Sequence, residues 1–260
     1  MSRTVAIVVV ALVTLTIEAT VLPSGGYSDV EVGIAGGKNA TPGQFPWHVK
    51  LIITANGTTF LGGASLITPT VVITAAHCVN WVSPDVTVIG GLKWVDPPST
   101  VQRRKADKFK IHPKIFGQCR DDIALIKLKA PFDIKASNGT IGTVNLPPRN
   151  HEVNGEVVVT GWGRISDTER STTLRYATIP VVDDSVCATR FPCYTEKKLC
   201  AGGGGRGICP GDSGGGAVEY TNKSAVLVGI SSGGGGGCGK IPAYFVRVSS
   251  YLDWINSNSI

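Results

Sequence analysis

Short apolar runs recur between residues 47 and 248 of the chain, and Gly, Pro and Asn residues separate them. The runs are rich in β-branched and aromatic side chains, which favour strands. Six of them define the pattern: residues 49–54, 64–67, 86–89, 157–160, 226–230 and 245–248. Strands this short and this regularly spaced predict an all-β fold of antiparallel barrels.

One stretch predicts a helix, and it ends the chain. Tyr251, Trp254 and Ile255 fall on one face at helical spacing, and either Ser249 or Ser250 is placed to cap the first turn. The sequence contains no internal repeat. We therefore expect barrels followed by a C-terminal helix.

Residues 1–19 have the features of a secretory signal peptide. Arg3 provides the positive start, residues 5–17 the apolar stretch, and Ile17-Glu-Ala19 the cleavage site with its small residue. A membrane anchor is the alternative, but the apolar run is shorter than the ~20 residues that a span needs. We expect a secreted, extracellular protein with no membrane segment.

Composition narrows the class of protein. The 260 residues are 17% charged and 42% hydrophobic, which fits packed globular units and excludes a disordered chain. The formal net charge is +6, but the basic residues are dispersed and the longest basic run is Arg103-Arg-Lys105. Dispersed charge is typical of a solvated surface, so no nucleic-acid partner is expected.

The sequence Gly211-Asp-Ser-Gly-Gly215 is the strongest candidate for chemistry. A serine hydroxyl attacks a carbonyl only when a base takes its proton and fixed donors hold the oxyanion. The glycines around Ser213 allow a sharp bend, so that the N–H groups of Gly211 and Ser213 point at one spot. Asp212 would then point the other way and need a buried cation.

A base and an acid precede this serine in the chain. Thr74-Ala-Ala-His77-Cys78 follows a buried apolar strand, and Asp122-Ile-Ala-Leu begins a second strand. His77 is the candidate general base, with a purely structural histidine at a strand end as the alternative. The order of base, acid and nucleophile excludes an α/β-hydrolase, in which the serine comes first.

These motifs resemble those of the trypsin/chymotrypsin-type serine proteases, with Ile34-Ala-Gly-Gly37, Thr160-Gly-Trp-Gly163 and Ser231 as further marks. The resemblance covers the chain from Ile34 onward and implies a protease domain over residues 34–260. It implies two six-stranded antiparallel barrels with the active site between them. His77 and Asp122 would come from the first barrel and Ser213 from the second.

Within that resemblance, each residue has an expected role. Ser213 is the nucleophile, His77 the base and then the acid, and Asp122 the group that orients the imidazole. Asp121 competes for the last role, but the family places the acid directly before Ile-Ala-Leu, so Asp121 is expected in solvent. The N–H groups of Gly211 and Ser213 would form the oxyanion hole.

The resemblance also implies activation by cleavage. Residues 20–33 would be a propeptide, and the α-ammonium freed at Ile34 would pair with Asp212. The sequence departs from the family at Ala35, which replaces valine. It also departs at Gly33, where an arginine or lysine usually directs a trypsin-like activator.

The chain has seven cysteines, so at least one is left without an intramolecular partner. The family implies two bridges, Cys187–Cys200 and Cys209–Cys238. Cys78 lacks its family partner because Gly62 stands in that position, and it is expected as a free, buried thiol. A third bridge between the remaining pair, Cys119 and Cys193, is a hypothesis.

The expected specificity pocket contains no carboxylate. Gly207 stands at the floor position where trypsin-like enzymes carry aspartate, and Ile208, Ser231, Gly233 and Ala243 occupy its walls. A buried Lys or Arg side chain would stay unpaired at a cost of several kcal/mol. We expect medium or large apolar residues before the cut bond.

Other departures support a second hypothesis. Ser232 replaces the tryptophan that usually lines the substrate groove, Gly216 replaces a proline, and residues 202–205 and 233–237 are rich in glycine. A secreted, protease-like binding protein with weak or no catalysis is therefore the alternative to an active endopeptidase. The intact serine, histidine and aspartate favour the enzyme.

The remaining expectations concern partners. Protein or peptide substrates and protein inhibitors would bind a monomer. No metal or other cofactor is expected, because no cluster of residues has metal-ligand spacing. Four sequons, at Asn39, Asn56, Asn138 and Asn222, suit a glycosylated secreted surface.

Overall fold

The structure is a computed structural model, and it describes residues 34–81, 83–91, 101–116, 119–164, 170–221, 224–234 and 237–259. The predicted signal peptide, the predicted propeptide and the sequon at Asn222 lie outside these residues. Asn39, Asn56 and Asn138 are exposed.

The first half of the described chain forms a closed antiparallel barrel. Its six strands pair in the order β2-β3-β4-β7-β6-β5. Their bounds are β2 (His48–Ala55), β3 (Thr58–Thr68), β4 (Val71–Thr74), β5 (Asp85–Gly90), β6 (Gln102–Ile111) and β7 (Ala124–Leu128). In β2, alternate residues Val49, Leu51 and Ile53 are almost fully buried, as expected where one face of a strand fills a barrel.

The second half forms a seven-stranded sheet in the order β1-β9-β8-β11-β12-β13-β10. Its strands are β1 (Lys38–Asn39), β8 (Glu156–Gly161), β9 (Arg175–Pro180), β10 (Lys198–Ala201), β11 (Gly216–Thr221), β12 (Ser224–Gly233) and β13 (Ala243–Arg247). A single bridge between Val181 and Ala201 links the end of β9 to β10. The predicted second barrel is therefore a half-barrel, to which the short strand β1 is added.

Short helices connect and end these sheets. The α-helices are α1 (Ala76–Val79), α2 (Asp184–Ala188) and α3 (Leu252–Asn258), and the 3-10 helices are η1 (Pro113–Phe116), η2 (Lys135–Ser137) and η3 (Val248–Tyr251). The predicted serine cap is wrong, because η3 carries the chain into α3 and neither Ser249 nor Ser250 caps a helix. The predicted face is present, with Tyr251 and Ile255 buried.

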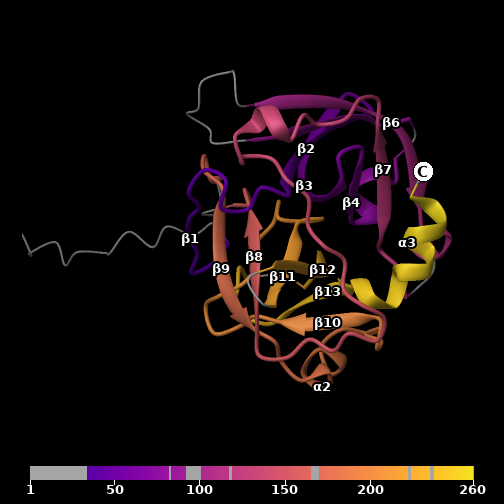
Figure 1. Ribbon diagram of the computed structural model, residues 1–260. Helices are drawn as coiled ribbons and strands as arrows, with labels where there is room; N and C mark the ends of the chain where they lie inside the picture. Colours follow the sequence, from indigo (N-terminus) through magenta and orange to yellow (C-terminus); the bar gives the residue numbers. More distant parts are fainter. Residues whose placement is uncertain are drawn as a thin grey trace, which may run out of the picture. The chain divides into compact units, whose positions relative to one another are not determined.

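Two apolar cores hold the fold together. Tyr251, Leu252 and Ile255 belong to the same core as the first barrel, so the C-terminal helix packs on the half that is remote in sequence. Figure 1 shows α3, in yellow, beside β6 and β7. Ile34 belongs to the core of the second sheet, with Ile208 and Ala243. In the described ranges, no helix has the length and apolarity to cross a membrane.

Candidate active site

His77 is positioned by the strand that precedes it. The four residues of β4 are buried between β3 and β7, and the chain then turns into α1 with His77 as its second residue. The Thr74 hydroxyl donates to the Gly63 carbonyl at 2.8 Å and fixes the end of the strand on β3. The imidazole is left partly exposed at the edge of the first barrel.

Asp122 lies two residues before β7 and next to the end of β4, because Thr74 pairs with Ala124. Its Oδ1 accepts the backbone N–H of His77 at 2.8 Å, and its Oδ2 lies 2.7 Å from Nδ1 of the same residue. Burial alone would raise the pKa of Asp122, but the hydrogen bonds from His77 and Ser232 outweigh it and lower that pKa. The carboxylate therefore stays ionised and fixes the ring orientation.

The other ring nitrogen of His77 faces a thiol. His77 Nε2 lies 3.7 Å from Sγ of Cys78, which is buried and free. Burial lowers the pKa of His77, but its hydrogen bonds with Asp122 and Cys78 raise it by more. The net shift is upward, so this imidazole is a stronger base than a solvated one.

Asp121 differs from the prediction, because it is buried and not solvated. It is 7% exposed; the Tyr251 hydroxyl donates to its Oδ1 at 2.8 Å, and Nδ1 of His112 lies 3.5 Å from its Oδ2. The two neighbouring carboxylates thus have separate partners. Asp121 holds the C-terminal segment on the first barrel, and Asp122 holds His77.

The loop around Ser213 is tied to the first barrel. The Ser213 carbonyl accepts the N–H of Gly63 at 2.8 Å, and Gly214 N–H donates to the Ser231 carbonyl at 2.9 Å. Gly214 has φ +80°, and a Cβ there would collide with the Thr74 hydroxyl and the Gly63 carbonyl. Only glycine fits, which explains why the motif continues with glycine after the serine.

These contacts place Ser213 beside the base. His77, Cys78, Gly211 and Ser213 line one cavity of about 310 Å³, together with Arg170. The structure thus brings the three predicted catalytic residues to the junction of the two sheets. His77 connects the other two, because it lines a cavity with Ser213 and contacts Asp122.

Comparisons with known proteins assign the chain to a family. The family model described as Trypsin matches residues 34–255. The chain belongs to the trypsin family. Among curated relatives, coagulation factor IX of Oryctolagus cuniculus is 36% identical over 92% of this chain and 89% of its own length. Brachyurin of Leptuca pugilator is 33% identical over 87% of this chain and 98% of its own length. Trypsin Tyr p 3.0101 of Tyrophagus putrescentiae is 35% identical over 85% of this chain and 79% of its own length. Like these relatives, the chain is a serine endopeptidase.

Asp212 explains the Thr160-Gly-Trp-Gly163 motif of this trypsin-family chain. Its buried carboxylate accepts the N–H groups of Gly163 at 2.7 Å and Cys209 at 2.8 Å. A Cβ on Gly161 or Gly163 would overlap that carboxylate. Burial raises the pKa of Asp212 to about 7, and the two backbone hydrogen bonds and Arg170 oppose the shift only in part.

Ile34 lies in the same part of the second sheet. It is fully buried, and Ala35 and Gly207 exchange two backbone hydrogen bonds, of 2.7 and 3.2 Å. Gly207 is the predicted pocket floor, so the segment after the predicted cut supports that floor directly. Ile208 and Ala243, the predicted walls, are buried in the same core as Ile34.

The remaining predicted pocket residues lie on β12, and here the structure shows something that the sequence did not. The register of β12 shifts between Ser231 and Gly233. Ser232 therefore turns inward, and its Oγ donates to Asp122 Oδ2 at 2.6 Å, whereas the Oγ of Ser231 is buried without a partner in the described structure. Sequence reasoning treated Ser232 only as a lost tryptophan, and no sequence signal marks the register shift.

The cysteines follow the predictions in part. Bridges join Cys187 to Cys200 and Cys119 to Cys193. The predicted Cys209–Cys238 bridge does not form in this structure: both are free thiols, and a hydrogen bond links their side chains. Cys238 has a left-handed backbone, with φ +44°.

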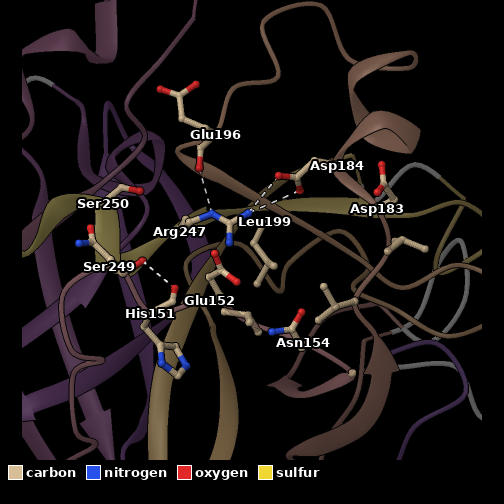
Figure 2. A pocket seen from close by; sticks show the side chains of 15 residues that line it. His151, Glu152, Asn154, Asp183, Asp184, Glu196, Leu199, Arg247, Ser249 and Ser250 are labelled. Carbon is tan, nitrogen blue, oxygen red and sulfur yellow. Dashed lines mark hydrogen bonds and ion pairs between the residues drawn. The ribbon is translucent and has the colours of Figure 1, made fainter.

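A larger cavity, of about 650 Å³, lies elsewhere on this trypsin-family domain. It lies between the segment that leads into β8 and the start of β10, and in it Arg247 bonds the Glu196 carbonyl and pairs with Asp184 (Figure 2). None of the three predicted catalytic residues lines it. In the part of the chain that the structure describes, no three His, Cys, Asp or Glu side chains are grouped to hold a metal ion.

Proposed function

We propose that this endopeptidase works through Ser213, His77 and Asp122 and an acyl-enzyme. The observation that carries the proposal is the 2.7 Å contact between His77 Nδ1 and Asp122 Oδ2, with His77 and Ser213 lining one cavity. The lowered pKa of Asp122, which keeps this carboxylate ionised against the ring, supports its assignment as the orienting acid.

In the first step, the Ser213 hydroxyl attacks the substrate carbonyl, and its proton passes to His77 Nε2. The N–H groups of Gly211 and Ser213 stabilise the oxyanion. The C–N bond then breaks as His77 returns the proton to the leaving amine. Water repeats the two transfers and releases the acid product.

The experiment is covalent labelling with a phosphonofluoridate. We expect the chain cut before Ile34 to carry the adduct on Ser213, and His77→Ala to lose it at unchanged folding. Ser213→Ala is the matched control for the site of labelling. If the folded, processed chain is not labelled, the protease-like binding protein becomes the better description.

The proposal includes secretion and activation by cleavage between Gly33 and Ile34. The apolar leader supports secretion, and the raised pKa of Asp212 supports activation, because a fully buried carboxylate is stabilised by a nearby ammonium. N-terminal sequencing of protein from the culture medium tests both. A start at Ile34 is expected in active samples, and activity in a chain that retains residues 20–33 contradicts the activation step.

We also propose an apolar preference at the residue before the cut bond. The support is chemical: Gly207, Ile208 and Ala243 offer no carboxylate to a Lys or Arg side chain. Cleavage of a peptide library after Leu, Met, Phe or Tyr is expected. Cleavage mainly after Lys or Arg contradicts the proposal.

A further inference from the structure

The cavities that meet at His77 are cationic. The first, of about 310 Å³, contains Arg170; a second, of about 480 Å³, contains Arg120 and Lys198. Arg120 also lines a third, of about 320 Å³. The only carboxylate that lines any of the three is Asp122, in the part of the chain that the structure describes.

Asp122 forms no ion pair with these cations, although its charge acts on Lys198. Its two oxygens already accept the backbone and ring N–H groups of His77 and the hydroxyl of Ser232, at 2.6 to 2.8 Å. Neither Arg120 nor Lys198 forms an ion pair with a carboxylate among the described residues. A ligand that enters the second cavity therefore meets two cations that have no ion-pair partner among the described residues, and one carboxylate, Asp122.

Lys198 is held in place at this wall. Its Nζ donates to the Cys193 carbonyl at 2.6 Å and lies 4.8 Å from the centre of the Tyr244 ring. The Cys119–Cys193 bridge joins the segment before Asp122 to the segment before β10 across this cavity. These contacts fix the position of Lys198. They use one of its three ammonium hydrogens, so two remain to donate hydrogen bonds to a ligand.

From this geometry we infer that the cleft selects peptides with an acidic side chain near the scissile bond, and that Lys198, aided by Arg120, is the specificity-determining cation. The inference rests on the proposed function and adds a substrate class to it. His77, Arg120 and Lys198 line the same cavity, so a carboxylate bound by these cations lies near the scissile bond. A charge-assisted hydrogen bond to a fixed ammonium is worth more than one to a neutral amide, so Glu is preferred over Gln.

The test is a positional scan of peptides around one apolar cleavage site, with Glu, Gln or Lys placed at each of three positions on either side. The chain cut before Ile34 is the enzyme. At one position at least, we expect kcat/KM to be about 10-fold higher for Glu than for Gln, the size expected of a charge-assisted contact. Lys198→Gln should make kcat/KM equal for Glu and Gln at that position. Lys198→Glu should make the Lys peptide the better substrate there. Lys129→Gln, which changes an exposed lysine that lines none of these cavities, should leave it unchanged.

A binding measurement separates this inference from the proposed mechanism. Calorimetry would compare Glu and Gln peptides with a reduced, uncleavable bond on Ser213→Ala. Tighter binding of the Glu peptide that is lost in Lys198→Gln supports the inference, whether or not the active chain cuts any peptide. A failure to cut any peptide would reject only the proposed mechanism. Equal binding or equal kcat/KM for Glu and Gln at every position, or a ratio that survives Lys198→Gln, overturns the inference.

Discussion

The two sheets position their catalytic residues by different means. In the first barrel, His77 and Asp122 follow and precede adjacent paired strands, and just two glycines with positive φ occur between residues 48 and 128 in the described ranges. In the second sheet, Ser213 lies on a loop, and ten such glycines occur between residues 202 and 239. Ordering glycine costs more backbone entropy than ordering other residues. The base and the acid are therefore preformed by strand pairing, whereas the nucleophile depends on close packing around its loop.

The largest effect is expected in the preformed half. Asp122→Asn keeps the shape but removes the charge that orients His77, and for this arrangement in the family the loss in kcat is about 10⁴-fold. Steady-state rates on an apolar peptide measure it. Asp121→Asn is the matched control: it should cost stability through Tyr251 and leave kcat within a few-fold. Equal losses in the two variants would contradict the assignment of Asp122.

In the second sheet, the next prediction concerns the close packing around the buried Asp212 carboxylate. Gly163→Ala places a Cβ within 2.5–2.6 Å of the Asp212 carboxylate, so the buried acid must move or lose its hydrogen bonds. We expect the free energy of unfolding to fall by about 2–4 kcal/mol, the range for overpacking combined with a disturbed buried charge. Urea unfolding measures it.

The control for Gly163→Ala is Gly142→Ala. A Cβ on Gly142 meets only Pro46, at 3.3 Å, so its cost should stay below about 1 kcal/mol. If both variants are equally stable, close packing around Asp212 does not organise the loop of Ser213.

Asp212 also predicts a pH dependence in the uncut chain. Its pKa is about 7 in the folded protein against an ordinary value of 3.8, so between these values the folded state holds a proton that the unfolded state has lost. Stability should therefore fall as pH rises from 4 to 7, by on the order of 1 kcal/mol per pH unit. Asp212→Asn should remove this slope. Cleavage before Ile34 should remove it as well, since an ammonium partner lowers the pKa of the acid.

The contrast between the halves also explains what the sequence predicted. The places of His77, Asp122 and the loop of Ser213 in the fold could be predicted because strand patterns and short motifs fix them locally. The inward turn of Ser232, the burial of Asp121 against Tyr251 and the free thiols of Cys209 and Cys238 were missed. Each of these depends on a register shift, on the packing of a remote segment, or on the backbone at a single residue, none of which leaves a periodic signal.

The smallest effect concerns the thiol beside the base. Burial lowers the pKa of His77, and Asp122 and Cys78 together raise it by more, so Cys78→Ala should lower it. The imidazole must be neutral to accept the Ser213 proton, so the acidic limb of the kcat/KM profile should move to lower pH with little change in the plateau. Cys78→Ser keeps a polar group near Nε2, so its acidic limb should lie between those of the unchanged protein and Cys78→Ala. An unchanged limb in Cys78→Ala would mean that the 3.7 Å contact leaves the base unaffected.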